Sequence, residues 1–166
     1  GGDGDRRDDQ FRKRSYPRKR DPTLLVGDLT MRDAANADEI VREALADALV
    51  GLGFGLISGG TDNHLSLIDL RKSHPNVSGK DAQLALDAAH ITTNKNTIPF
   101  ETRSPFEASG IRLGTPAVTA RGMKEAEMEL VAAWIDRVLG SSGDAATMTA
   151  VRGEIRAFCG KFPLFH

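Results

Sequence analysis

The side chains that could do chemistry in this sequence gather in three short stretches. The first, SGGTDNHL (Ser58–Leu65), combines two glycines with Asp62, Asn63 and His64. Such a cluster could be a catalytic centre, a phosphate-binding loop or a tight turn. Glycine permits sharp reversal of the backbone, and Asp and Asn side chains hydrogen-bond neighbouring backbone groups in turns. Because a lone histidine is more often structural than catalytic, we interpret this stretch as a turn between two strands.

The second and third stretches are TTNKNTIP (Thr92–Pro99) and RSPFEASGIRLGTPAVTARG (Arg103–Gly122). They contain Arg112, whose planar guanidinium can bind a carboxylate with two parallel hydrogen bonds, as a lysine cannot. They also contain Asn96, whose amide offers both a donor and an acceptor to the edge of a heterocycle. By residue type alone, a surface arginine paired with a nearby acid is the simpler interpretation of Arg112. Asn96 could equally be a turn residue before Pro99.

A long amphipathic helix is predicted over residues 36–53 by an apolar stripe at helical spacing. Asn36 or Asp38 can cap its start, and Gly51 or Gly53 can supply the positive φ that ends it. The residues of the stripe are Ile40, Val41, Ala44, Leu45, Ala48 and Leu49.

Two short apolar segments, FGLIS and HLSLIDLR, flank the glycine-rich turn and predict a pair of strands. A second helix is predicted over residues 78–90, with Ser78 as its N-cap. Its apolar side would carry Leu84, Leu86 and either Ala88 or Ala89.

The remainder predicts two more strands and two closing helices. ITTNKNTIPF opens with β-branched residues, and SGIRLG reads as a strand that leads into a helical turn at Pro116. The closing helices would bury one stripe of Met128, Val131, Ala132, Ile135 and Leu139, and another of Met148, Val151, Ile155, Phe158 and Phe162. This order predicts an α+β fold, a small antiparallel or mixed sheet with helices packed on one face.

Length and composition predict one cored domain, residues 31–166, preceded by an arm, residues 1–30. The chain has 166 residues, of which 40% are hydrophobic. The first 22 residues hold eight Arg and Lys against five Asp, so we expect this arm to be extended or disordered. Its basic patch, Arg12–Arg20, could contact RNA or an acidic protein surface, although a solvated tail is the simpler interpretation.

The single cysteine, Cys159, cannot form an internal disulfide, which favours a reducing compartment. No apolar run reaches the roughly 20 residues that a membrane span requires. We therefore expect a cytoplasmic or mitochondrial protein without a membrane span.

Taken together and in order, the three stretches resemble the small C-terminal domain of serine hydroxymethyltransferase, from about Asp38 to the C-terminus. The resemblance implies a pyridoxal-phosphate enzyme that interconverts serine and glycine with tetrahydrofolate. It implies that Arg112 binds the substrate carboxylate and that Asn96 contacts the folate pterin. It also implies a partner, since the family's large domain, which supplies the cofactor-binding lysine, lies outside these 166 residues.

No lysine here follows the Thr-rich TTHK type of motif that carries the cofactor in that family. The lysines are Lys13, Lys19, Lys72, Lys80, Lys95, Lys124 and Lys161. DAAH (Asp87–His90) spells the family's cofactor motif, but it falls at the end of a predicted helix, so we interpret it as a coincidence. The chain alone is therefore expected to contain no catalytic residue, to bind neither cofactor and to be inert.

Two functions follow as alternatives. The chain could be the small domain of a serine hydroxymethyltransferase that a large domain on another chain completes. It could instead be an enzyme-derived, non-catalytic subunit of a larger assembly, such as a mitochondrial ribosome or respiratory complex, which would use the basic arm for contacts. In either case, apolar surface that normally packs on a partner predicts concentration-dependent association.

Overall fold

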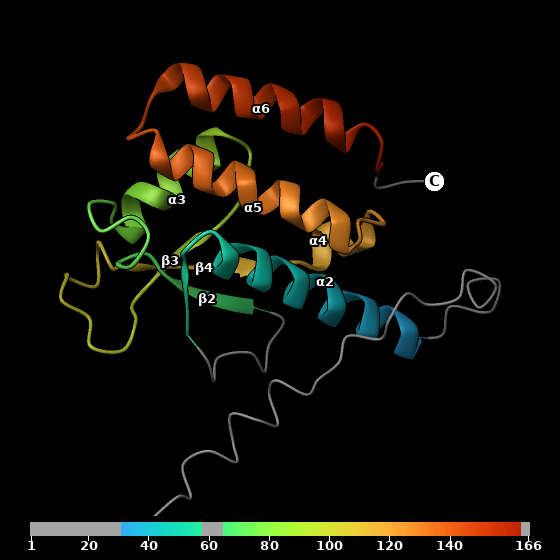
Figure 1. Cartoon of the computed structure of the whole chain (residues 1–166), viewed down its shortest axis with the longest axis horizontal. Coiled ribbons are helices and arrows are strands. Elements are labelled where there is room, and N and C mark those ends of the chain that lie inside the picture. Colours follow the sequence, from blue (N-terminus) through green and yellow to red (C-terminus); the bar gives the residue numbers. More distant parts are fainter. Residues whose placement is uncertain (1–30, 58–64, 164–166) are drawn as a thin grey trace, which may run out of the picture. The chain divides into compact units, whose positions relative to one another are not determined.

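The computed structural model describes residues 31–57 and 65–163, with side chains from residue 36 onward. The basic arm, residues 1–30, and the stretch 58–64, for which a turn is predicted, lie outside the described residues. The elements, shown in Figure 1, are α2 (Met31–Gly51), β1 (Gly55–Leu56), β2 (Leu65–Asp69), α3 (Gly79–Ala88), β3 (Asn94–Asn96), β4 (Gly110–Gly114), α4 (Pro116–Ala120), α5 (Glu125–Gly140) and α6 (Ala145–Cys159).

The four strands form one antiparallel sheet in the order β1-β2-β4-β3. In Figure 1 the helices lie on one side of this sheet, with α2 and α5 above β2 and β4 and with α6 farthest away. The fold is therefore a small α+β domain, and the predicted order of helices and strands is confirmed.

The core lies between the sheet and the helices. Ile68 of β2 and Ile111 of β4 are cross-strand partners, and both are fully buried. The predicted helical stripes supply most of the other side of the core: Val41, Leu45, Leu49, Leu86, Met128, Ala132, Ile135, Leu139, Val151 and Ile155 are all buried. Successive side chains of a strand point to opposite faces of the sheet, and each helix has one apolar stripe. The helices therefore pack on the apolar face of the sheet and leave the other face uncovered.

The predicted start of the first helix is wrong. The helix begins at Met31, before Asn36 or Asp38 could cap it, because the good helix formers Ala34 and Ala35 extend it past the apolar stripe. Asp38 instead lies inside the helix, buried, and accepts hydrogen bonds from the Thr115 and Thr119 hydroxyls at 2.9 and 2.8 Å.

Three predicted helix ends are confirmed. The first helix ends at Gly51, and Gly53 has the predicted positive φ, 97°. The Ser78 hydroxyl caps α3 by accepting a hydrogen bond from the Asp81 amide at 3.0 Å, and Pro116 is the first residue of α4.

The predicted apolar side of α3 is partly wrong. Leu86 and Ala89 are buried, but Leu84 is 60% exposed. The buried residues recur at spacings of four and three, starting from Ala82, and Leu84 is two positions from both Ala82 and Leu86. Residues two apart on a helix point to opposite sides, so Leu84 faces away from the core.

The two closing helices are joined by polar contacts as well as by their apolar stripes. Trp134 Nε1 donates to Glu154 at 2.9 Å, and Arg137 forms an ion pair with the same carboxylate at 2.9 Å. Asp144 caps α6 by accepting from the Thr147 amide. In the described ranges, no helix is long and apolar enough to cross a membrane.

Candidate substrate-binding face of the sheet

The face of the sheet that points away from the helices carries the predicted binding residues. Ile111 and Leu113 of β4 are buried toward the helices, so Arg112 between them points to the opposite side, which we call the outer face. Directly opposite residues in an antiparallel sheet share a face. Arg112 pairs with Leu67 of β2 and Asn94 of β3, so these three side chains form a row across the outer face.

Asn96 lies on the same face, one pair further along β3. It is opposite Gly110 and therefore diagonal to Arg112, a spacing of about 7–8 Å in an antiparallel pair. Its Nδ2 donates to the Thr97 carbonyl oxygen at 2.7 Å. The structure thus brings together the two residues that the sequence predicts for binding, although they are separated by 15 residues of chain.

The Arg112 guanidinium is exposed, and within the described part of the chain it takes part in no ion pair or side-chain hydrogen bond. The simpler interpretation of this residue required a nearby acid as partner. A guanidinium that is accessible and unpaired retains its full set of donors for a ligand carboxylate.

Two glycines let the strands that carry these residues approach each other. A Cβ on Gly110 would lie 2.5 Å from Ile98 Cγ2 and 2.9 Å from the Asn96 carbonyl oxygen. A Cβ on Gly79, at the start of α3, would lie 2.5 Å from the Gly110 carbonyl oxygen. The glycine of SGIR is therefore required by close backbone packing between β4, β3 and α3 rather than by a turn.

An ion pair that the sequence reasoning missed lies beside this row. Asp69, at the end of β2, is opposite Gly110, and Arg71 Nη2 contacts its carboxylate at 3.0 Å. Burial alone would raise the pKa of Asp69, but the hydrogen bonds and charge of Arg71 outweigh burial and lower that pKa below its ordinary value. The carboxylate is therefore ionised at neutral pH.

The loop that connects β3 to β4, residues 97–109, is organised around Glu101. Its carboxylate accepts hydrogen bonds from the amides of Ile98, Thr102, Arg103 and Ser109 at 3.3, 3.1, 3.0 and 2.9 Å, and from the Ser109 hydroxyl at 2.6 Å. Burial opposes ionisation, but these donors lower the pKa of Glu101 to about 2. Glu101 thereby ties the start of the loop to its end, immediately before the strand of Arg112.

The same loop exposes two large apolar side chains. Phe100 is 94% exposed and Phe106 is 79% exposed, although both belong to a loop with a well-bonded backbone. Phe100 has a positive φ of 58°, and its carbonyl oxygen accepts from Arg71 Nη1 at 3.0 Å. Apolar side chains held out in this way are typical of a surface that contacts something else.

The other residues considered from the sequence lie elsewhere. Lys95 is opposite Ile111, so it starts on the face opposite to Arg112, and its Nζ donates to the Phe106 carbonyl oxygen. Asp87–His90 lies at the C-terminal end of α3, where Asp87 and His90 are exposed and Ala89 is buried. His64 lies outside the described residues, and the described residues contain no group of His, Cys, Asp and Glu that could hold a metal ion.

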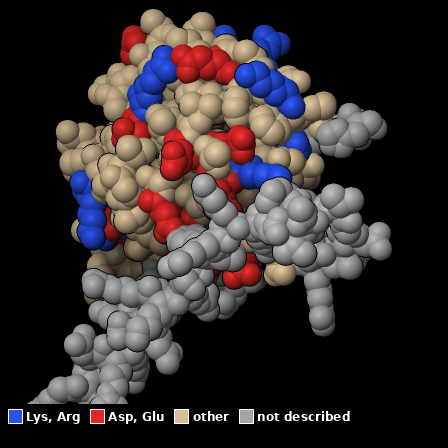
Figure 2. Space-filling model, turned by 45° about the vertical axis from the view of Figure 1, so that its right-hand side comes forward, with Lys and Arg blue, Asp and Glu red and all other residues tan. Residues whose placement is uncertain are grey.

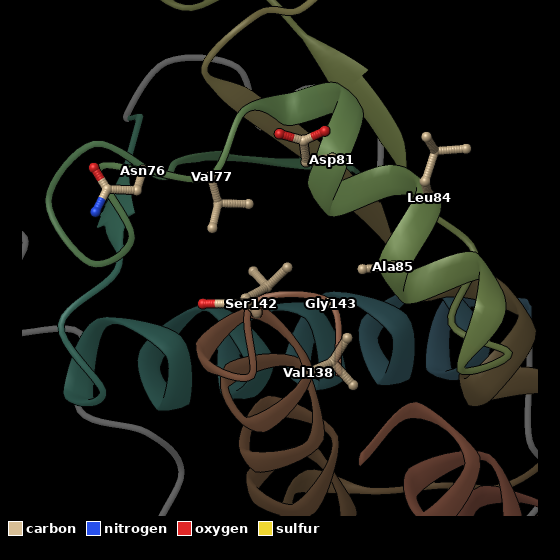
Figure 3. Close-up of a pocket in the computed structure, with 9 residues that line it drawn as sticks. Asn76, Val77, Asp81, Leu84, Ala85, Val138, Ser142 and Gly143 are labelled. Atoms are coloured by element: carbon tan, nitrogen blue, oxygen red, sulfur yellow. The ribbon is translucent and has the colours of Figure 1, made fainter. Parts of the chain in front are cut away.

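A hollow of about 340 Å³ lies between α3 and the C-terminal end of α5. Figure 3 shows Val77, Leu84, Ala85 and Val138 around it, with Asp81 at the rim. Its only charged lining residue is an acid, so it does not suit an anionic ligand. Figure 2 shows Lys and Arg lying beside Asp and Glu on the face in view, rather than a continuous basic area.

Sequence reasoning missed Arg71 and Glu101 because some of their contacts join residues that are distant in the chain, and it missed Asp69 although its partner Arg71 is only two residues away. Arg71 reaches backbone carbonyls 28 and 29 residues away, and Glu101 bonds a residue eight positions later. The only local signal was the Asp-Leu-Arg spacing at the end of a predicted strand, which places the two charges on one face.

Comparison with known proteins identifies the family of this chain. A family model described as serine hydroxymethyltransferase matches residues 34–135, which include all four strands. A serine hydroxymethyltransferase from Acinetobacter radioresistens is 50% identical over 123 residues, which cover 74% of this chain and 29% of that protein. The chain thus spans less than a third of the length of this relative. The chain belongs to the serine hydroxymethyltransferase family.

Proposed function

We propose that this chain is the small-domain part of a serine hydroxymethyltransferase, which interconverts serine and glycine with tetrahydrofolate. In this proposal Arg112 binds the substrate carboxylate and Asn96 contacts the folate. The observation that carries it is the exposed guanidinium of Arg112 on the outer face, which has no partner among the described residues and lies in the same strand pair as Asn96. Inertness of the chain alone and the need for a large domain are part of the same proposal.

The described hydrogen-bond donors of the outer face suit the binding of substrate and folate, but they do not include a group that could hold pyridoxal phosphate. The Arg112 guanidinium, unpaired among the described residues, matches a carboxylate, and the side-chain amides of Asn94 and Asn96 match a heterocycle edge. Pyridoxal phosphate carries the electron-sink chemistry of such enzymes and requires a lysine amine to hold its aldehyde. Lys95, the lysine nearest in the strands, starts on the other face and is already hydrogen-bonded, so no step is assigned to this chain through the cofactor.

A chimaera tests the proposal. The globular part of this chain would replace the segment of the Acinetobacter radioresistens enzyme that it matches, and serine cleavage would be measured with tetrahydrofolate. We expect activity, and we expect Arg112→Lys to raise the KM for serine by about 10–100-fold, because the lysine loses the two-pronged contact. The matched control is Arg152→Lys, an exposed arginine on α6, which should leave the KM unchanged.

Two results would contradict the proposal. An active chimaera whose KM is indifferent to Arg112→Lys would remove Arg112 from substrate binding. An absorption change when the chain alone is mixed with pyridoxal phosphate and glycine, beyond that of the same mixture without the chain, would contradict its inertness.

Purification of the native protein distinguishes the alternative. Co-purification with a large-domain chain, or as part of a longer chain that contains it, supports the enzyme. Co-purification with an RNA–protein or membrane assembly that lacks such a domain supports a non-catalytic subunit that uses Arg12–Arg20 for contacts.

A further inference from the structure

The carboxylate of Asp69 lies on the same face of the sheet as the Arg112 guanidinium and could compete for it. Leu67 is directly opposite Arg112, and Asp69 is two residues further along the same strand, so Asp69 and Arg112 share the outer face as diagonal neighbours. Diagonal neighbours lie about 7–8 Å apart, a distance that a long side chain can span. Asp69 is the only acid in the described strands.

Arg71 occupies this carboxylate completely. Its Nε donates to Oδ1 and Oδ2 at 3.1 and 3.3 Å, its Nη2 donates to Oδ2 at 3.0 Å, and its backbone amide donates to Oδ1 at 2.9 Å. The Asp69 side chain is only 10% exposed, so leaving this carboxylate unpaired after the loss of Arg71 would be costly. Among the described residues, the cations left to it are Lys72, whose charge also lowers the pKa of Asp69, and Arg112 on the same face of the sheet.

The Arg71 guanidinium is also held from its other side. Nη1 donates to the Phe100 carbonyl oxygen at 3.0 Å and Nη2 to the Pro99 carbonyl oxygen at 3.3 Å. These contacts come from the loop whose shape Glu101 fixes, and the charge of Glu101 also favours the charged form of Arg71 by raising its pKa. The arginine is therefore kept in the position that covers Asp69.

We propose that Arg71 is a positioning residue that keeps Asp69 from pairing with Arg112 and so leaves Arg112 available to an external carboxylate. The availability of Arg112 is a property of this chain alone. Its use for the serine carboxylate rests on the proposed function.

Arginine side-chain NMR on the 166-residue chain tests the first part. The variant Arg71→Met keeps most of the aliphatic part of the side chain and removes the guanidinium group. We expect the Arg112 Nε–H to become protected from hydrogen exchange in this variant, because Asp69 now pairs with it. In the double variant Arg71→Met/Asp69→Asn, the protection should disappear, since the neutral amide no longer attracts the guanidinium. If Arg71 had only a structural role, the added change Asp69→Asn would not remove the protection of the Arg112 Nε–H.

The matched control is Arg137→Met, which removes a different arginine–carboxylate pair, that with Glu154 on α6. It should leave the Arg112 signal unchanged. If the Arg112 Nε–H exchanges equally fast in Arg71→Met and in the unaltered chain, or if Arg137→Met protects it to the same extent, the inference is wrong. Should Arg71→Met fail to fold, Arg71→Gln is measured in the same way.

Serine kinetics in the chimaera test the second part. Arg71→Met should raise the KM for serine about fivefold, the effect of having to break one part-exposed ion pair, and Asp69→Asn should reverse this rise in the double variant. Protection of Arg112 without any change in KM would uphold the role of Arg71 and refute the use of Arg112 for substrate. Absence of protection refutes the role of Arg71, whether or not the chimaera is active.

Discussion

The glycine of the SGIR stretch offers the sharpest test of how the outer face is built. In Gly110→Ala the new Cβ would meet Ile98 Cγ2 at 2.5 Å, the Asn96 carbonyl oxygen at 2.9 Å and the Ile68 carbonyl oxygen at 3.0 Å. Two of these three atoms belong to the backbones of the neighbouring strands, so a rotamer change cannot relieve the overlap. The strands must move apart.

The expected cost follows from that overlap. Extra atoms in a packed interior typically cost about 1–3 kcal/mol through displaced backbone and side chains. Because both neighbours of β4 are contacted, we expect the upper part of this range, about 2–3 kcal/mol of unfolding free energy. Movement of β3 would also shift Asn96 relative to Arg112.

Urea unfolding provides the measurement. The chain has one tryptophan, Trp134, which is buried in α5 and reports unfolding by fluorescence. The matched control is Gly153→Ala, because Gly153 is an exposed residue inside α6 whose Cβ would meet nothing within 4 Å. That change should stabilise the chain by about 0.5–1 kcal/mol, since alanine is the better helix former.

Equal stability of Gly110→Ala and the unaltered chain would refute the argued packing of β3 against β4. A loss of stability in Gly153→Ala would show that alanine itself, rather than the overlap, is harmful. The expected result is therefore a loss of stability in Gly110→Ala together with a gain of stability in Gly153→Ala.

Three further changes test other contacts by the same unfolding measurement. The pKa of Glu101 is lowered from 4.5 to about 2, so its contribution to the free energy of unfolding is fully present above about pH 4.5 and is lost as the pH falls toward 2. Glu101→Gln should therefore be less stable than the unaltered chain by about 1–2 kcal/mol near neutrality. A difference in stability that does not shrink between pH 4.5 and pH 2 would contradict the role of the Glu101 carboxylate. Asp38→Ala should cost about 1–3 kcal/mol, because the Thr115 hydroxyl is left buried without its acceptor, and Asp38→Asn should recover part of this loss. Ser78→Ala should cost about 1 kcal/mol by uncapping α3, while Ser78→Asp, which can still cap, should cost less; equal losses would argue against capping.

Local pattern predicted most of the elements of this fold. The spacing of apolar residues indicates whether a segment is a helix or a strand. A helix places apolar residues on one side with a period of about 3.6 residues, whereas a strand does so with a period of two. Where the prediction was wrong, the pattern was weak. The start of α2 has no apolar stripe, and Leu84 was included although its spacing does not match Ala82 and Leu86.

The sequence by itself determined the α+β class, the cap at Ser78 and the start of α4 at Pro116. The cap and the helix start depend on residue type and on neighbours within a few positions. The choice of Arg112 and Asn96 as candidate binding residues came from the resemblance of three stretches to one family.

Only the tertiary structure decided that Asn96 and Arg112 lie diagonally on one face, because strand register is set by contacts between residues far apart in the chain. It also decided that Arg71, while paired with Asp69, is held by the loop at Pro99. That arrangement needs the end of β2 and the loop at Pro99 to meet in space, and no local spacing contains that information.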